Sequence, residues 1–147
     1  MKTAVIFAAL CVAYVAAEHR PCPLMREMAI GVKKCVETTN PDKETKDLVR
    51  HREGLDDEKA NCFRACILNE AGLMENGAFN FPRMAELLNE CGRGNSDVGD
   101  ELVEKLKSCQ EDAEAFDNDC TVAGKYAECL NKFMPPHRRG HRGEEDE

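Results

Sequence analysis

The segment Asn61-Cys62-Phe63-Arg64-Ala65-Cys66-Ile67 determines how this chain can fold. It follows an acidic stretch at 56–58 and precedes Gly72, which are typical of the start and the end of a helix. On a helix, the Cβ atoms of Cys62 and Cys66 would be about 5–6 Å apart, whereas those of a disulfide are about 3.8 Å apart. The two cysteines therefore do not bond each other easily, and we expect this helix to be joined to two other parts of the chain.

The two ends of the chain differ in composition from the middle. Lys2 precedes an apolar run at residues 4–17, and charged residues follow from Glu18. This is typical of a secretory signal peptide cleaved after Ala17. A membrane anchor is the alternative, but about 14 apolar residues are fewer than the roughly 20 that span a membrane. Residues 137–147 contain no apolar side chain, which indicates disorder. We expect a signal peptide at 1–17, a helical ligand-binding domain at 18–134 and a charged tail at 135–147, in a secreted, extracellular protein.

Charge and cysteine content limit the possible functions. Loss of Lys2 with the signal peptide changes the net charge from −8 to −9, which argues against nucleic acid or an anionic membrane as the main partner. Of the nine cysteines, Cys11 would leave with the signal peptide, and the even remainder predicts a disulfide framework. A metal site is the alternative use, but the C-x2-C pairs and histidine spacing of such a site are missing. We expect no metal and no cofactor.

Apolar residues recur at helical spacing along the whole mature chain,. Turn signals separate six such segments, and no stretch alternates with the period of a strand. Asn76-Gly77 predicts a tight turn between the third and fourth segments. The sequence therefore predicts an all-α domain of six helices, at about 24–38, 42–53, 58–71, 81–91, 97–116 and 120–133.

Nothing in the sequence resembles a catalytic centre. No histidine lies on an apolar helical face beside a carboxylate, as a general base would,. His51, on a polar segment, and His137 and His141, in the tail, are interpreted as solvated, although a modulation of ligand release by the charge of the tail remains an open alternative. The acidic clusters lack the ligand pattern of a calcium loop. We expect no enzyme activity.

Helix geometry removes only some of the possible cysteine pairings. Eight cysteines allow about a hundred pairings. Cys62–Cys66 is disfavoured, and Cys120 and Cys129 would lie about 13.5 Å apart along one helix axis, beyond the reach of a disulfide. The remaining bridges must join one helix to another, and the residues alone leave their identity open.

The cysteine spacing resembles that of a known family. The pattern Cys35-x26-Cys62-x3-Cys66-x42-Cys109-x10-Cys120-x8-Cys129 is similar to the six-cysteine signature of insect odorant-binding proteins, the pheromone- and general-odorant-binding family. Gly72, Gly77, Ala123 and Tyr126 add to the resemblance. The resemblance implies the disulfides Cys35–Cys66, Cys62–Cys120 and Cys109–Cys129. Cys22 and Cys91 remain after this assignment, and we predict a fourth bridge between them.

The resemblance also implies a cavity that holds a small apolar ligand. Disulfides lower the entropy of the unfolded chain, so the fold can tolerate a cavity that would otherwise be costly. Core packing is the alternative role for every apolar residue on an inner face, and the Tyr126 hydroxyl is a candidate anchor for an alcohol, aldehyde or ester group. The candidate ligand-binding residues are Met28, Val32, Phe63, Ile67, Met74, Met84, Leu87, Leu88, Phe116, Tyr126, Phe133 and Met134.

The resulting functional hypothesis is a secreted carrier that takes odorants, pheromones or fatty compounds through aqueous fluid to receptors. The expected partners are this small apolar ligand and, by the resemblance, an olfactory receptor. We expect no membrane insertion and a monomer or weak dimer. The alternative on the same scaffold is a carrier or scavenger outside olfaction, or a protein that presents a surface to a receptor.

Overall fold

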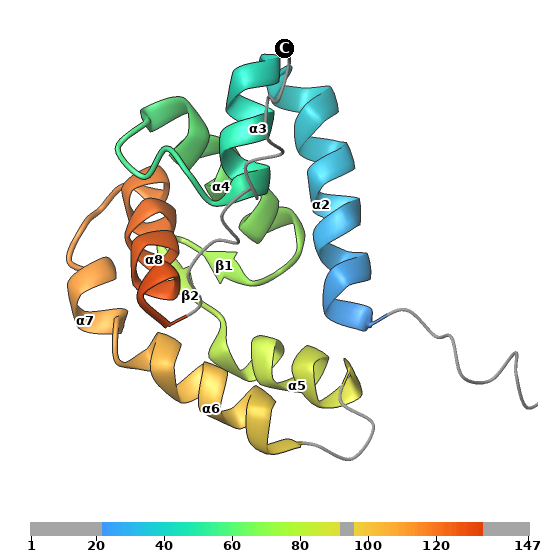
Figure 1. Ribbon diagram of the computed structural model, residues 1–147, viewed down its shortest axis with the longest axis vertical. Helices are drawn as coiled ribbons and strands as arrows, with labels where there is room; N and C mark the ends of the chain where they lie inside the picture. Colours follow the sequence, from blue (N-terminus) through green and yellow to red (C-terminus); the bar gives the residue numbers. More distant parts are fainter. Residues whose placement is uncertain (1–21, 92–95, 134–147) are drawn as a thin grey trace, which may run out of the picture.

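A computed structural model of the protein describes residues 22–91 and 96–133. These residues form seven helices and one short hairpin (Figure 1). The all-α fold class expected from the sequence is confirmed, whereas the expected signal peptide and charged tail lie outside the described residues. The elements are α2 (Pro23–Thr39), α3 (Lys43–His51), α4 (Glu58–Glu70), β1 (Met74–Glu75), β2 (Ala78–Phe79), α5 (Phe81–Cys91), α6 (Ser96–Lys107), α7 (Gln110–Ala113) and α8 (Asp119–Phe133).

Helix α4 is the centre of the fold. It packs against α2 on one side and α8 on the other, while α5 packs against α6 (Figure 1). Its start is fixed by Asp57, whose side chain accepts a hydrogen bond of 2.7 Å from the backbone N–H of Ala60,. Its end is fixed by Gly72, which has a φ of 69°. The N–H of Leu73 then donates to the carbonyl of Leu68 at 2.8 Å, which is the hydrogen bond of a Schellman cap.

The turn expected at Asn76-Gly77 closes a hairpin that the sequence did not predict. Asn76 and Gly77 have φ values of 52° and 75°, as the two central residues of a type I′ turn require. Met74 pairs with Phe79 in antiparallel register. Each strand has two residues, which is too short for an alternation of polar and apolar side chains to be seen in the sequence.

The single helix expected at 97–116 is instead two helices, so the count is seven among the described residues rather than six. α6 ends at Lys107, and α7 is a separate short helix. At the break, the Ser108 hydroxyl donates to the carbonyl of Lys105 at 2.6 Å, and the N–H of Cys109 donates to the carbonyl of Leu106 at 3.0 Å. A serine side chain that bonds to the backbone in this way competes with the regular helical hydrogen bonds. The apolar residues keep their helical spacing across the break, so the sequence pattern did not predict it.

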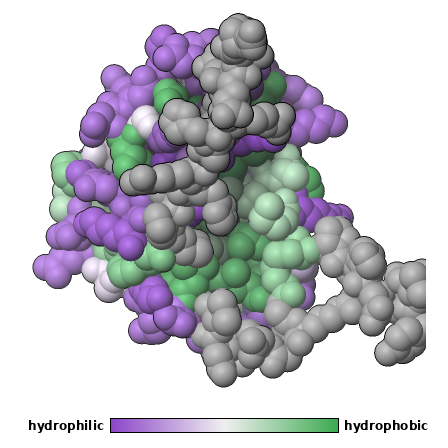
Figure 2. All heavy atoms as spheres, in the orientation of Figure 1, coloured by the Kyte–Doolittle hydropathy of each residue, from purple (hydrophilic) through white to green (hydrophobic). Residues whose placement is uncertain are grey.

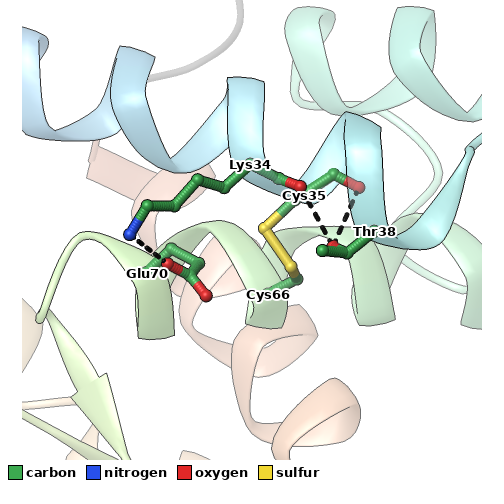
Figure 3. A network of polar contacts seen from close by, with 5 residues as sticks. All are labelled: Lys34, Cys35, Thr38, Cys66 and Glu70. Carbon is green, nitrogen blue, oxygen red and sulfur yellow. Dashed lines mark hydrogen bonds and ion pairs between the residues drawn. A yellow bond between two sulfur atoms is a disulfide. The ribbon is translucent and has the colours of Figure 1, made fainter.

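Four disulfides fix the helices relative to one another, and their pairs are those expected from the resemblance and from the two remaining cysteines. They are Cys22–Cys91, Cys35–Cys66, Cys62–Cys120 and Cys109–Cys129. Helix α4 is thus joined to α2 through Cys66 and to α8 through Cys62. Figure 3 shows the bridge to α2 beside an ion pair of 2.8 Å between Lys34 and Glu70, which joins the same two helices at the surface.

Candidate ligand-binding cavity

An apolar cavity of about 320 Å³ lies among the helices, near the lower end of the range for small-molecule sites, about 300–1,000 Å³. Met25 lines it and is 65% exposed, which places the mouth of the cavity at the start of α2. Figure 2 shows apolar side chains gathered on the face framed by α2, α5, α6 and α8. The cavity is lined by Leu24, Met25, Met28, Val49, Arg52, Arg64, Ile67, Leu68, Leu73, Phe79, Met84, Leu102, Leu106, Ala123, Tyr126, Ala127 and Leu130.

The helical period explains why α4 contributes Arg64, Ile67 and Leu68 to the wall. At about 100° per residue, these three positions share one face, and the half-cystines Cys62 and Cys66 lie on the opposite face. The disulfides therefore hold α4 from behind without occupying the cavity. On α8 the lining residues recur in the same way, at positions 123, 126, 127 and 130.

Tyr126 connects the apolar wall to a polar network. Its side chain belongs to the buried core at 3% exposure, and its ring centroid lies 4.9 Å from that of Phe79. The hydroxyl donates to Glu114 Oε1 at 2.8 Å. The same oxygen accepts the backbone N–H of Phe79 at 2.9 Å, and Gln110 donates to Oε2 at 2.9 Å. Glu114 thus joins the hairpin, α7 and α8.

The protonation of this network follows from its surroundings. Burial, and then the hydrogen bond and the charge of Glu114, raise the pKa of Tyr126 far above its ordinary value, so the phenol is neutral,. Burial by itself would raise the pKa of Glu114, but the hydrogen bonds from Phe79, Gln110 and Tyr126 outweigh it, and the pKa is lowered. Because the hydroxyl proton is held by a carboxylate, the phenol oxygen is left as an acceptor for a ligand that donates a hydrogen bond.

Arg64 is the buried cation of the wall. Its side chain is 7% exposed, and burial lowers the pKa of its guanidinium. Nη1 donates to the carbonyl of Gly54 at 3.1 Å and to Asn61 Oδ1 at 2.6 Å, and Nη2 donates to the carbonyl of Glu53. These bonds attach the segment before α4 to the helix itself.

The structure brings four of the candidate residues into the cavity wall: Met28, Ile67, Met84 and Tyr126. The other candidates lie elsewhere. Met74 and Leu87 are buried in the main core, Phe63 is buried against Cys35 and Ile67, and Leu88 packs at the margin of the main core. Val32, Phe116 and Phe133 are exposed, and Met134 lies outside the described residues.

Several lining residues were missed by sequence reasoning. Ala123 and Leu130 stand about one helical turn from Tyr126, so the helical period could have identified them, whereas Leu68 and Ala127 directly follow Ile67 and Tyr126 in the sequence. Phe79 lies in the hairpin, which was not expected. Arg64 was not predicted to line the cavity, because a charged side chain on a helix is normally expected to be exposed to solvent.

The other hollows are polar and carry no recognisable chemistry. One of about 250 Å³ lies between residues 55–61 and the start of α8, and its wall includes Asp56, Glu58, Lys125 and Glu128. Within 22–91 and 96–133, no group of three or more acidic, histidine or cysteine side chains could hold a metal ion. In the same ranges, no helix is both long and apolar enough to cross a bilayer.

Comparison with known proteins gives one match. A family model described as the PBP/GOBP family matches residues 23–132, which is nearly all of the described chain and contains every residue of the cavity wall. No curated protein and no solved structure matches the chain.

Proposed function

We propose that this chain, which belongs to the PBP/GOBP family, is a secreted carrier that encloses an odorant, a pheromone or a related fatty compound and delivers it to receptors. The family binds small hydrophobic ligands. The observation that carries the proposal is the cavity, in which fourteen of the seventeen lining residues are apolar. A hydrocarbon chain, which cannot form hydrogen bonds, can bind to such a wall through apolar contacts alone.

The energetics of the cavity suit a reversible carrier. Each buried methylene contributes about 0.8 kcal/mol, so a chain of about ten methylenes gains roughly 8 kcal/mol before the cost of association. Three methionines, Met25, Met28 and Met84, lie in the wall. Their flexible side chains adapt to ligands of different shape, which supports micromolar binding of a range of apolar compounds.

Tyr126 narrows the polar selectivity proposed from the sequence. Its proton is donated to Glu114, so the oxygen can accept a hydrogen bond from an alcohol but has no free proton for an aldehyde or an ester. We therefore expect alcohols to gain from Tyr126, and aldehydes and esters to bind through their chains alone.

Displacement of a fluorescent naphthylamine dye by apolar compounds tests the proposal. Ala127 lines the cavity, whereas Ala29 on α2 is exposed, so Ala127→Phe and Ala29→Phe form a matched pair. We expect the wild type and Ala29→Phe to bind the dye at micromolar concentration, and Ala127→Phe, which fills the cavity, to bind it at least about tenfold more weakly. Equal dye affinity in the two variants, or no binding by the wild type, would contradict the proposal.

A further inference from the structure

We infer that a fatty ester binds in this cavity with its hydrocarbon tail inward and its ester group at the mouth, beside Met25. The inference rests on the proposed carrier function and specifies how a ligand of this class is oriented in the same cavity. Two features of the wall support it. The polar side chains of the described wall are bonded within the protein, and the wall is open to water at the end where Met25 lies.

The surface of the cavity is almost wholly apolar. Among the described lining residues, only Arg52, Arg64 and Tyr126 have polar side chains. Arg64 donates to two backbone carbonyls and to the Asn61 amide oxygen, and the Tyr126 hydroxyl donates to Glu114. Arg52 is not free either. These side chains therefore leave an ester inside the cavity without a hydrogen-bond donor.

An ester needs such a donor, because its oxygens accept hydrogen bonds and it has no proton to donate. In water the carbonyl oxygen is hydrogen-bonded to the solvent. Buried among apolar side chains, it loses these bonds and gains none, which is unfavourable. An alcohol differs, because the Tyr126 oxygen can accept its proton. The orientation inferred here therefore concerns esters, and aldehydes for the same reason.

The two ends of the cavity differ in their exposure to water. Met25, on α2, is 65% exposed, and the next residue, Arg26, is also exposed. Leu73 and Ala123 are the most buried residues of the wall, each at 1%. Ala123 lies on α8, on the far side of α4 from α2 (Figure 1). An ester group beside Met25 thus stays hydrated, while the end of the tail reaches the buried residues.

An ester bound in both directions equally is the alternative, because its hydrocarbon chain makes apolar contacts in either direction. The two directions differ in the hydration of the carbonyl oxygen, which is kept at the mouth and lost at the buried end. The cost of an unsatisfied buried acceptor corresponds to a preference of about tenfold or more for the orientation with the tail inward.

NOEs from the two ends of methyl dodecanoate test this orientation in the wild-type protein. The ester has an O-methyl group at one end and a chain methyl group at the other, with separate NMR signals. We expect NOEs from the O-methyl protons to the Met25 methyl group, and from the chain methyl protons to the methyl groups of Leu73 and Ala123. O-methyl NOEs to Leu73 or Ala123 as strong as those to Met25 would overturn the inference.

Two branched esters provide a matched pair for dye displacement. In tert-butyl dodecanoate the added bulk is on the ester group, and in the second compound, a methyl ester, the chain ends in a tert-butyl group. We expect the first to bind within about threefold of methyl dodecanoate. The second should bind about tenfold more weakly, because its bulk is placed against the closed end of the cavity.

An equal or greater loss of affinity from bulk on the ester group than from bulk on the tail would overturn the inference. Displacement of the dye by methyl dodecanoate would still support the carrier function in that case. Failure of this ester and of the other apolar compounds to displace the dye would instead contradict the carrier function itself.

Discussion

Removal of the Cys22–Cys91 disulfide should cost this protein a large part of its stability. The bridge joins the residue before α2 to the end of α5 across a sequence separation of 69. It is the one pair that the six-cysteine signature does not include. The double substitution Cys22→Ser and Cys91→Ser removes it and leaves three disulfides in place.

The expected magnitude follows from the separation. In the chain-entropy model, closing a loop of this length removes about 4 kcal/mol of unfolded-state entropy. The Cys109–Cys129 bridge closes a separation of 20, and the same relation gives about 3 kcal/mol. The free energy of unfolding of a small domain is about 5–15 kcal/mol. The loss of either disulfide should therefore be evident in urea denaturation followed by far-ultraviolet circular dichroism.

The bridge should also influence binding. Leu24 and Met25, two and three residues after Cys22, line the cavity, so the first turn of α2 is held at the mouth by the bond to Cys91. We expect the double variant to bind the dye several-fold more weakly under conditions in which it is still folded. A loss of unfolding free energy below about 1 kcal/mol, or a larger loss from Cys109→Ser and Cys129→Ser than from the longer loop, would refute the entropic reasoning.

Three further predictions concern the interior. Tyr126→Phe removes the hydroxyl that donates to Glu114 and should lower the unfolding free energy by about 1–3 kcal/mol, measured in urea. Because the pKa of Glu114 is lowered from its ordinary 4.5, its stabilisation is fully present above that value and is lost as pH falls through the lower folded value. The acid limb of stability should therefore be shallower in Glu114→Gln, and an unchanged limb would argue against this network. Gly124→Ala should destabilise the fold by about 1–3 kcal/mol, since a Cβ atom there would lie 2.6 Å from Asn61 Nδ2; an unchanged melting temperature would show that α4 and α8 can separate at no cost.

The positions of the helices could be predicted from the sequence because the residues that begin and end a helix lie close to it in the chain. Asp57 and Gly72 mark the two ends of α4, and Asn118 caps α8 by accepting the backbone N–H of Cys120 at 2.8 Å, within the break expected at 117–119. These effects act over three or four residues. The disulfide pairs came from the resemblance, since helix geometry alone left many open.

The cavity was less predictable, because it depends on distances between helices. A position on the inner face of a helix predicts that a residue is buried, but not whether it lines the cavity. Met84 and Leu87 are both buried on α5, and only Met84 lines the cavity. Phe116 was expected on the inner face of a continuous helix, but α7 ends at Ala113, and Phe116 lies exposed in the turn that follows. The buried position of Arg64 and its three protein acceptors became known only from the structure.

The central claim is that a small apolar ligand lies between α2, α4, α6 and α8. Intermolecular NOEs between methyl dodecanoate and the methyl groups of the protein test this claim most directly, because they report which residues contact the ligand. We predict NOEs to Leu68, Leu106 and Leu130, which line the cavity. NOEs confined to the exposed Ile30 and Val32, or none under conditions in which the ester displaces the dye, would contradict it.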